Sequence, residues 1–146
     1  MQIEIKIDKS RCEPRIIIET DQITDEIQEI ISKLSNSSTR MLTGFRENTL
    51  EILNQQEILR IYAQSGKVLA ATTSGEYILR FRLYELEQRL DPTCFVRISN
   101  SEIINLKKVK GFDLNLVGSI RVTLTDGSVT YVSRRYISKI KQLLGI

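Results

Sequence analysis

Hydrogen-bond donors stand at predicted turns and helix starts in the last third of this chain. Arg134 and Arg135 follow a predicted strand and open the last predicted helix. Guanidinium forks suit guanine edges and phosphates, and the amides of a helix start add to phosphate binding; the alternative is an exposed pair that solvates a helix end. Asn100 could bond an adenine edge or cap a turn at 101–104, and Ser101 suits a phosphate or a cap equally.

Two further groups of donors could contact bases or phosphates, or they could be ordinary exposed side chains. Gln64 and Lys67 flank Ser65-Gly66 and could reach base edges, or they could belong to an ordinary hairpin tip. The run at 107–110 contains Lys107 and Lys108, which would add phosphate contacts and salt dependence, or would only solvate a strand edge. Arg97, in the middle of a predicted strand, is expected to support a neighbouring loop.

The sequence lacks the residue patterns that catalysis, phosphate-loop binding and metal binding commonly use. The chain has no histidine, which is the commonest general acid–base, and no glycine-rich phosphate-binding motif. Cys12 and Cys94 belong to no metal-ligand spacing, and we expect them to be free cytosolic thiols. The sequence therefore predicts no catalytic residue, no metal site and no cofactor.

Composition indicates a globular protein of one domain with a small appendage. The 146 residues are 41% hydrophobic and 27% charged, and no apolar run is long enough for a membrane span or a signal peptide. We therefore expect a cytoplasmic location. The net charge of +3 is uneven, because residues 1–44 carry six basic and eight acidic side chains whereas residues 45–146 carry fifteen basic and ten acidic ones.

The first part, residues 1–44, has the pattern of a small strand–strand–helix unit. Residues 1–8 alternate, with isoleucines at every second position, and 15–20 is a second short apolar run. Over 22–34 the apolar residues fall on one helical stripe. Because two strands and one helix are marginally stable alone, we expect this unit to dock or to pair with a second copy.

The second part, residues 45–146, is predicted to be mainly β, which makes the fold class α+β. Turn residues such as Ser74-Gly75 and Asp126-Gly127 recur between short apolar runs. Strands are expected at 49–53, 58–62, 68–72, 77–82, 95–98, 108–115, 119–125 and 128–132, and helices at 83–90, 100–104 and 133–144.

Three segments of this second part carry a family resemblance. They are the hairpin at 58–82, the string Phe95-Val96-Arg97 with Ser101-x-Ile103-Ile104-Asn105-Leu106, and Asp126-Gly127 followed by Val132-Ser133-Arg134-Arg135-Tyr136. Together they resemble the LytTR-type DNA-binding domain of bacterial transcription regulators, over roughly residues 45–146. The resemblance implies an elongated arrangement of small β-sheets with short helices, whose loops enter successive major grooves. Residues 1–44 are too few for the receiver domain often joined to this domain.

The resemblance also implies the DNA-binding residues. Two positions depart from the family pattern, since Ser99 stands where histidine is usual and Glu102, which adds a negative charge to the same turn, where an aromatic residue is usual. Asn105 is expected to be a buried structural amide. The residues assigned to DNA are Gln64, Lys67, Ser99, Asn100, Ser101, Lys107, Lys108, Arg134, Arg135 and Lys139.

The leading hypothesis is a sequence-specific regulator that binds double-stranded DNA and has no enzymatic activity. The resemblance implies control by an inhibitory membrane protein. We also expect a homodimer at least on DNA, because pairing through residues 1–44 would fit direct-repeat sites. Two alternatives stay open: a protein–protein interaction module whose basic surface is incidental, and an RNA-binding module. Salt dependence separates the first alternative from DNA binding, and competition between duplex DNA and RNA hairpins separates the second.

Overall fold

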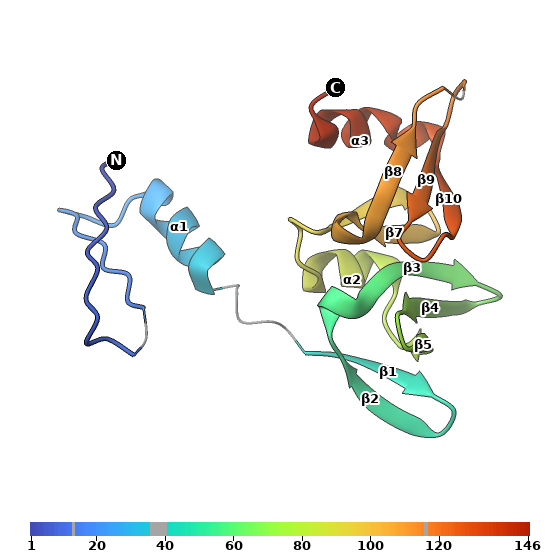
Figure 1. Cartoon of the computed structure of the whole chain (residues 1–146), viewed down its shortest axis with the longest axis horizontal. Helices are drawn as coiled ribbons and strands as arrows, with labels where there is room; N and C mark the ends of the chain where they lie inside the picture. Colours follow the sequence, from blue (N-terminus) through green and yellow to red (C-terminus); the bar gives the residue numbers. More distant parts are fainter. Residues whose placement is uncertain (13, 36–40, 116) are drawn as a thin grey trace. The chain divides into compact units, whose positions relative to one another are not determined.

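The computed structural model describes residues 1–12, 14–35, 41–115 and 117–146 (Figure 1). The chain divides into two compact units, Met1–Ser38 and Thr39–Ile146. The boundary expected after residue 44 falls inside the first strand of the second unit, Leu42–Arg46. Each unit is described by itself.

The first unit contains one helix, α1 (Asp25–Ser35). Thr24 precedes it, and its hydroxyl accepts a hydrogen bond from the Ile27 amide at 3.4 Å, as a helix cap does. Asp25 and Glu26 place negative charge in the first turn, where the helix dipole favours it. The helix expected at 22–34 therefore forms, with a later start.

The two strands expected at 1–8 and 15–20 are wrong for this structure, because no strand is assigned to the described residues before α1. Ile3, Ile5 and Ile7 are 83%, 82% and 90% exposed. Their alternation defines which face of a strand would be buried, but one helix and two short strands cannot cover that face. The first unit alone therefore does not supply a surface that covers these isoleucines.

The second unit contains two antiparallel sheets, as expected for a mainly β fold (Figure 1). The larger sheet has the order β2-β1-β5-β4-β3-β7-β6, and the smaller has the order β10-β9-β8. The strands are β1 (Leu42–Arg46), β2 (Thr49–Leu53), β3 (Ile58–Gln64), β4 (Lys67–Thr72), β5 (Gly75–Leu79), β6 (Phe95–Ser99), β7 (Glu102–Asn105), β8 (Val109–Asp113), β9 (Ile120–Leu124) and β10 (Val129–Val132).

Short helices connect these strands. The α-helices of the unit are α2 (Leu83–Arg89) and α3 (Ile137–Leu144), and its 3-10 turns are η1 (Gln55–Glu57), η2 (Leu106–Lys108) and η3 (Arg134–Tyr136). The helix expected at 83–90 is α2, which ends just before Asp91-Pro92. The helix expected at 133–144 is η3 followed by α3, and Gly145, with φ +73°, terminates it.

Two local expectations were wrong. The strand β1 was not expected; its Gly44 lies so close to β5 that an added Cβ would come within 2.8 Å of the Tyr77 Cβ. The helical turn expected at 100–104 is instead a tight turn followed by β7. Both isoleucines of β7 are fully buried, which a strand between two cores can achieve and a one-turn surface helix cannot.

The strands β3, β7 and β6 are shared by two hydrophobic cores. On one face Ile61 and Ile103 join Leu83 and Leu86 of α2 and Leu90, which follows it. On the other face a second set packs against the small sheet and α3. This second set consists of Leu59, Val96, Ile98, Ile104, Ile120, Val122, Leu124, Val132 and Ile140. Successive residues of β7 therefore enter different cores.

The turn at Asp126-Gly127 has the chemistry expected of it. Gly127 has φ +86°, a conformation that glycine adopts without strain. The Asp126 carboxylate accepts hydrogen bonds from the Ser128 hydroxyl at 2.6 Å and the Ser128 amide at 2.9 Å. These bonds lower the pKa of Asp126, since they favour its charged form. They fix the connection between β9 and β10.

Asn105 is a buried structural amide, as expected. It is 2% exposed, and its Nδ2 donates to the Ile58 carbonyl of β3 at 2.8 Å. Its Oδ1 accepts from the Lys107 amide at 3.0 Å and so starts η2. One side chain thereby joins β7 to β3 and sets the direction of the following segment.

Replacing Asn105 should therefore destabilise the unit. Asn105→Ala leaves the Ile58 carbonyl and the Lys107 amide without their partner, and we expect the free energy of unfolding to fall by about 2 kcal/mol. Urea denaturation measures it. The exposed Asn115 is the control, and Asn115→Ala should change that free energy by less than about 0.5 kcal/mol. Equal losses for the two variants would contradict this role.

Candidate nucleic-acid interface

The tip of the β3–β4 hairpin lies beside the β6–β7 turn. Ser65 and Gly66 both have positive φ, +52° and +77°, the geometry of a tight two-residue hairpin turn. Gln64 and Lys67 flank this turn as cross-strand partners, and both are exposed. The amide of Ala63 donates to the carbonyl of Ser101 at 2.8 Å, so that the tip and the turn are held together.

The β6–β7 turn is held from beneath by Arg97. Its Nε donates to the Ser99 carbonyl at 2.7 Å, and its Nη2 donates to the Asn100 carbonyl at 2.6 Å. Its Nη1 lies 3.3 Å from the Glu87 carboxylate of α2. This confirms the supporting role expected for Arg97, whose guanidinium is occupied by the turn and by α2.

Asn100 is held by a residue far along the chain. The Tyr136 hydroxyl of η3 donates to the Asn100 Oδ1 at 3.1 Å. Ser99 and Ser101 are joined through their hydroxyls at 3.3 Å. The expected capping of a helix at 101–104 does not occur, because that helix is absent. Asn100 is exposed, with its amide oriented by Tyr136.

The arginine pair belongs to η3, which adjoins the same turn. The Ser133 amide donates to the Ile98 carbonyl of β6 at 2.9 Å. Arg134 and Arg135 follow and are exposed. The Arg134 guanidinium lies against the β8–β9 loop, because a Cβ added to Gly118 would lie 3.0 Å from the Arg134 Nη2.

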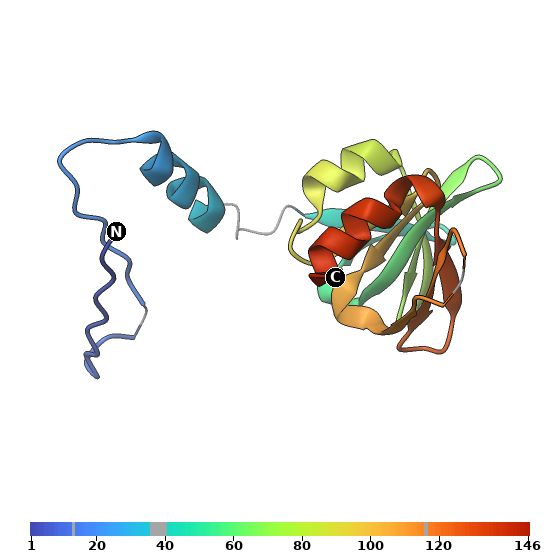
Figure 2. The ribbon, with the colours of Figure 1, turned by 90° about the horizontal axis from the view of Figure 1, so that it is seen from above.

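We call Gln64–Lys67, Ser99–Ser101 and Arg134–Tyr136 together the loop ridge. In Figures 1 and 2 the β3–β4 tip and the start of α3 both lie on the right-hand side of the unit, and the C-terminus lies to their left. Among the residues that the structure describes, no carboxylate forms an ion pair with Lys67, Arg134, Arg135 or the neighbouring Lys139. The loop ridge therefore presents unneutralised cations beside amide and hydroxyl groups.

The structure does not bring Lys107 and Lys108 to the loop ridge. Both belong to η2, where the Leu106 amide bonds the Cys94 carbonyl and the Thr125 amide bonds the Lys108 carbonyl. These contacts lie at the other end of β7, about 15 Å from the turn at the strand rise per residue. Figure 1 shows η2 and the β3–β4 tip at opposite ends of the strands.

The comparisons with known proteins decide the family. The family model of the LytTr DNA-binding domain matches residues 48–145. The chain belongs to the LytTR family. Uncharacterized HTH-type transcriptional regulators of Staphylococcus aureus strains NCTC 8325 and MSSA476 are each 33% identical to it over 147 residues, covering 100% of this chain and 99% of theirs. The similarity to these relatives thus includes the first unit.

A solved structure agrees with the observed fold. It is a LytTr DNA-binding domain from Bacillus cereus, part of a protein described as a methyl-accepting/DNA response regulator. The TM-score is 0.70 at 20% identity, covering 73% of this chain and 97% of that one. In the LytTR unit described here, α2 and α3 are separated by five strands, so that these two helices do not form a helix–turn–helix.

Glu102, which departs from the LytTR pattern, does not place negative charge on the loop ridge. It is 6% exposed and lies 2.5 Å from the Arg60 Nη1, and its second oxygen accepts from the Thr130 hydroxyl. Arg60 also stacks on the Tyr62 ring at 4.3 Å. Burial and the Glu76 carboxylate, which accepts from the Tyr62 hydroxyl, raise the pKa of Tyr62. Glu102 is therefore a buried link between the two sheets.

Sequence reasoning missed two supporting residues. Tyr136 was expected only as part of the family motif and of the last helix, and Gly118 carried no expectation. The local sequence offers no signal for either contact, because their partners lie in distant segments. Only the spacing of Tyr136 directly after the arginine pair could have indicated a shared role.

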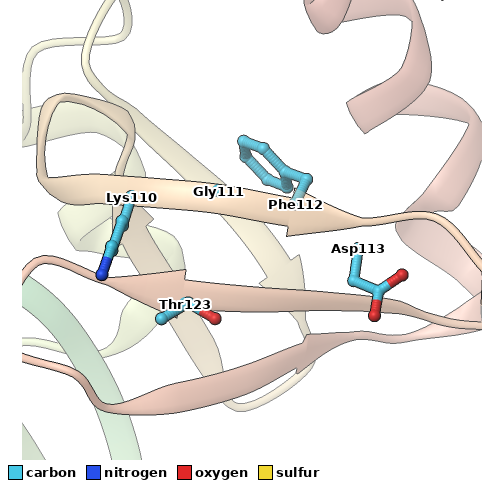
Figure 3. Close-up of a pocket in the computed structure, with 5 residues that line it drawn as sticks. All are labelled: Lys110, Gly111, Phe112, Asp113 and Thr123. Atoms are coloured by element: carbon cyan, nitrogen blue, oxygen red, sulfur yellow. The ribbon is translucent and has the colours of Figure 1, made fainter.

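A shallow depression in the described surface lies elsewhere. It has a volume of about 410 Å³ and is lined by Lys110, Gly111, Phe112, Asp113 and Thr123 (Figure 3). Asp113 is occupied by Arg121, at 3.6 Å. None of the ten residues assigned to DNA lines it.

Among the described residues, no group of three or more acidic or cysteine side chains is placed to hold a metal ion. No helix in the described part of the chain is long and apolar enough to cross a membrane.

The role of Arg97 predicts a change in local motion. Lysine has one cationic nitrogen and cannot reproduce the fork that bonds two carbonyls, so Arg97→Lys should loosen the β6–β7 turn. We expect backbone order parameters at Asn100 and Ser101 to fall from about 0.85 toward about 0.6 in NMR relaxation. Glu87→Gln, which keeps both carbonyl bonds, should leave them unchanged. Unchanged values in Arg97→Lys would contradict the role.

Proposed function

We propose that this LytTR protein is a transcriptional regulator that binds specific sequences of double-stranded DNA through the loop ridge. The observation that supports it is the meeting of three short, well-anchored turns whose outer side chains include cations that, among the described residues, pair with no carboxylate. Short turns of this kind fit the major groove, which presents a different donor and acceptor pattern for each base pair. The cations supply attraction to phosphates.

Each part of the loop ridge suits a different contact. Arg135 can reach a guanine edge with two bonds, whereas Arg134, which lies against Gly118, is better placed for the phosphate backbone. The Asn100 Nδ2 can donate to a purine edge while Tyr136 holds its Oδ1. Gln64 can read a base beside the phosphate partners Lys67 and Lys139, and Ser99 and Ser101 offer hydroxyls to the backbone.

Duplex DNA fits this surface better than the alternatives do. The major groove of A-form RNA is too deep and narrow for side chains on short turns to read. A surface for a protein partner would have an apolar centre, whereas the outward groups of the loop ridge are polar or cationic. Direct-repeat sites, action in the cytoplasm where the chromosome lies, and an inhibitory membrane protein are further parts of the proposal.

Selection of bound fragments from random duplex DNA tests the proposal and supplies the site. Arg135→Ala should then weaken binding to the selected site by about 1–3 kcal/mol and flatten discrimination at one base position. Affinity for the selected site and for random DNA is measured side by side. Equal losses on both would assign Arg135 to the backbone, and failure to select any sequence would overturn the proposal.

The salt dependence of binding tests which lysines face DNA. Lys67→Ala should weaken binding equally on all sequences and reduce the slope of log affinity against log salt by about one unit. Lys108→Ala is the matched control, since its position at the far end of β7 should leave the slope unchanged. An equal change of slope in the two variants would extend the interface to η2, as first expected from the sequence.

A further inference from the structure

The first unit exposes far more apolar surface than a segment of its size can keep in water. Its exposed isoleucines and leucine come from the start of the chain, from the run before α1 and from α1 itself. They are Ile3, Ile5, Ile7, Ile16, Ile17, Ile18, Ile23, Ile31 and Leu34. Exposed apolar groups in such a concentration mark an interaction surface.

The start of the chain has the features of a strand that lacks its neighbour. Among the described residues, Met1–Ile7 make no backbone hydrogen bond, so their amides and carbonyls are available for a ladder. The segment ends at a turn in which Asp8 accepts from the Ser10 amide at 2.9 Å and from the Ser10 hydroxyl at 2.6 Å. Isoleucines alternate with charged residues up to that turn.

We propose that this segment pairs antiparallel with the same segment of a second copy of the chain, centred on Ile5. In this register Ile5 faces Ile5 of the second copy, and Ile3 faces Ile7 of the second copy. Glu4 then faces Lys6 of the second copy, and the symmetry of the pair repeats that contact. The apolar face is continuous, and both charged cross-strand pairs are of opposite sign.

Charge selects this register over its neighbours. Moving the centre to Glu4 places two glutamates opposite each other, and moving it to Lys6 opposes two lysines as well as Glu4 and Asp8. Parallel pairing in register opposes like charges at all three charged positions. If one strand slid along the other by one residue, isoleucines would lie opposite charged side chains, and the isoleucines of the two strands would no longer share one face.

A second copy also supplies further segments to cover the apolar layer. Two strands and a helix are marginal alone, whereas two copies bring together twice that set of segments around one apolar layer. The exposed Ile31 and Leu34 of α1, together with Ile23 just before it, lie on the helical stripe predicted from the sequence and would cover that layer. The pairing does not depend on DNA, so it can fail or succeed independently of the proposed function.

Charge reversal tests the register in the full chain by sedimentation equilibrium. The wild type should have twice the 16.8 kDa mass of one chain. Glu4→Lys and Lys6→Glu each oppose like charges twice and should raise the dissociation constant at least about tenfold. The double variant Glu4→Lys/Lys6→Glu restores opposite charges and should dimerise like the wild type.

Mixing the two single variants gives a sharper result. Glu4→Lys carries two lysines and Lys6→Glu carries two glutamates in the paired positions, so that the mixture should form a heterodimer when neither variant dimerises alone. Lys110→Glu, the same charge change on exposed β8, should leave the mass unchanged. A monomeric wild type, or a dimer indifferent to these reversals, would overturn the proposal, and the former would favour a different protein partner.

Cysteine cross-linking checks the centre of the pairing. In a Cys12→Ser background, Ile5→Cys places two thiols opposite each other and should form a disulfide-linked dimer under mild oxidation. Ile3→Cys places its thiols about 13 Å apart along the strands, which is too far for a disulfide. Cross-linking of Ile3→Cys in preference to Ile5→Cys would rule out this register.

Discussion

The structure of the second unit depends on the burial of β7 on both of its faces. Ile103 enters the core with α2, and Ile104 enters the core with the small sheet and α3. The polar residues at its ends, Glu102 and Asn105, are buried as well and must therefore be paired. Glu102 bonds Arg60 and Thr130, and Asn105 bonds the backbone of β3 and that of η2.

This constraint explains why the loop ridge can be precise although it consists of turns. The β6–β7 turn joins two strands that are packed on both faces. Arg97 of β6, which pairs with Glu87 of α2, holds the carbonyls of the turn, and Tyr136 of η3 holds its asparagine. Binding groups on loops need such a rigid base to hold their geometry before the partner arrives. Arg60 and Thr130 hold the Glu102 carboxylate in the interior, so that it adds no negative charge to the loop ridge.

The sequence predicted the features that depend on neighbouring residues. Turn chemistry located the hairpins at Ser74-Gly75 and Asp126-Gly127, and leucine spacing located α2. Residues 100–104 were expected to form a helical turn, because a short run with two adjacent isoleucines has no period that separates a helix from a strand buried on both faces. The separation of Lys108 from the ridge and the burial of Glu102 arise from contacts between distant strands, which no local pattern contains.

The sharing of β7 also determines how the unit comes apart. A strand that contributes alternate residues to two cores cannot leave one without opening the other, so the cores lack independent stabilities. Loss of packing near α2 is transmitted to the small sheet and to η3 through the same four residues. The two strands that carry the β6–β7 turn are consequently formed or lost together with the whole unit.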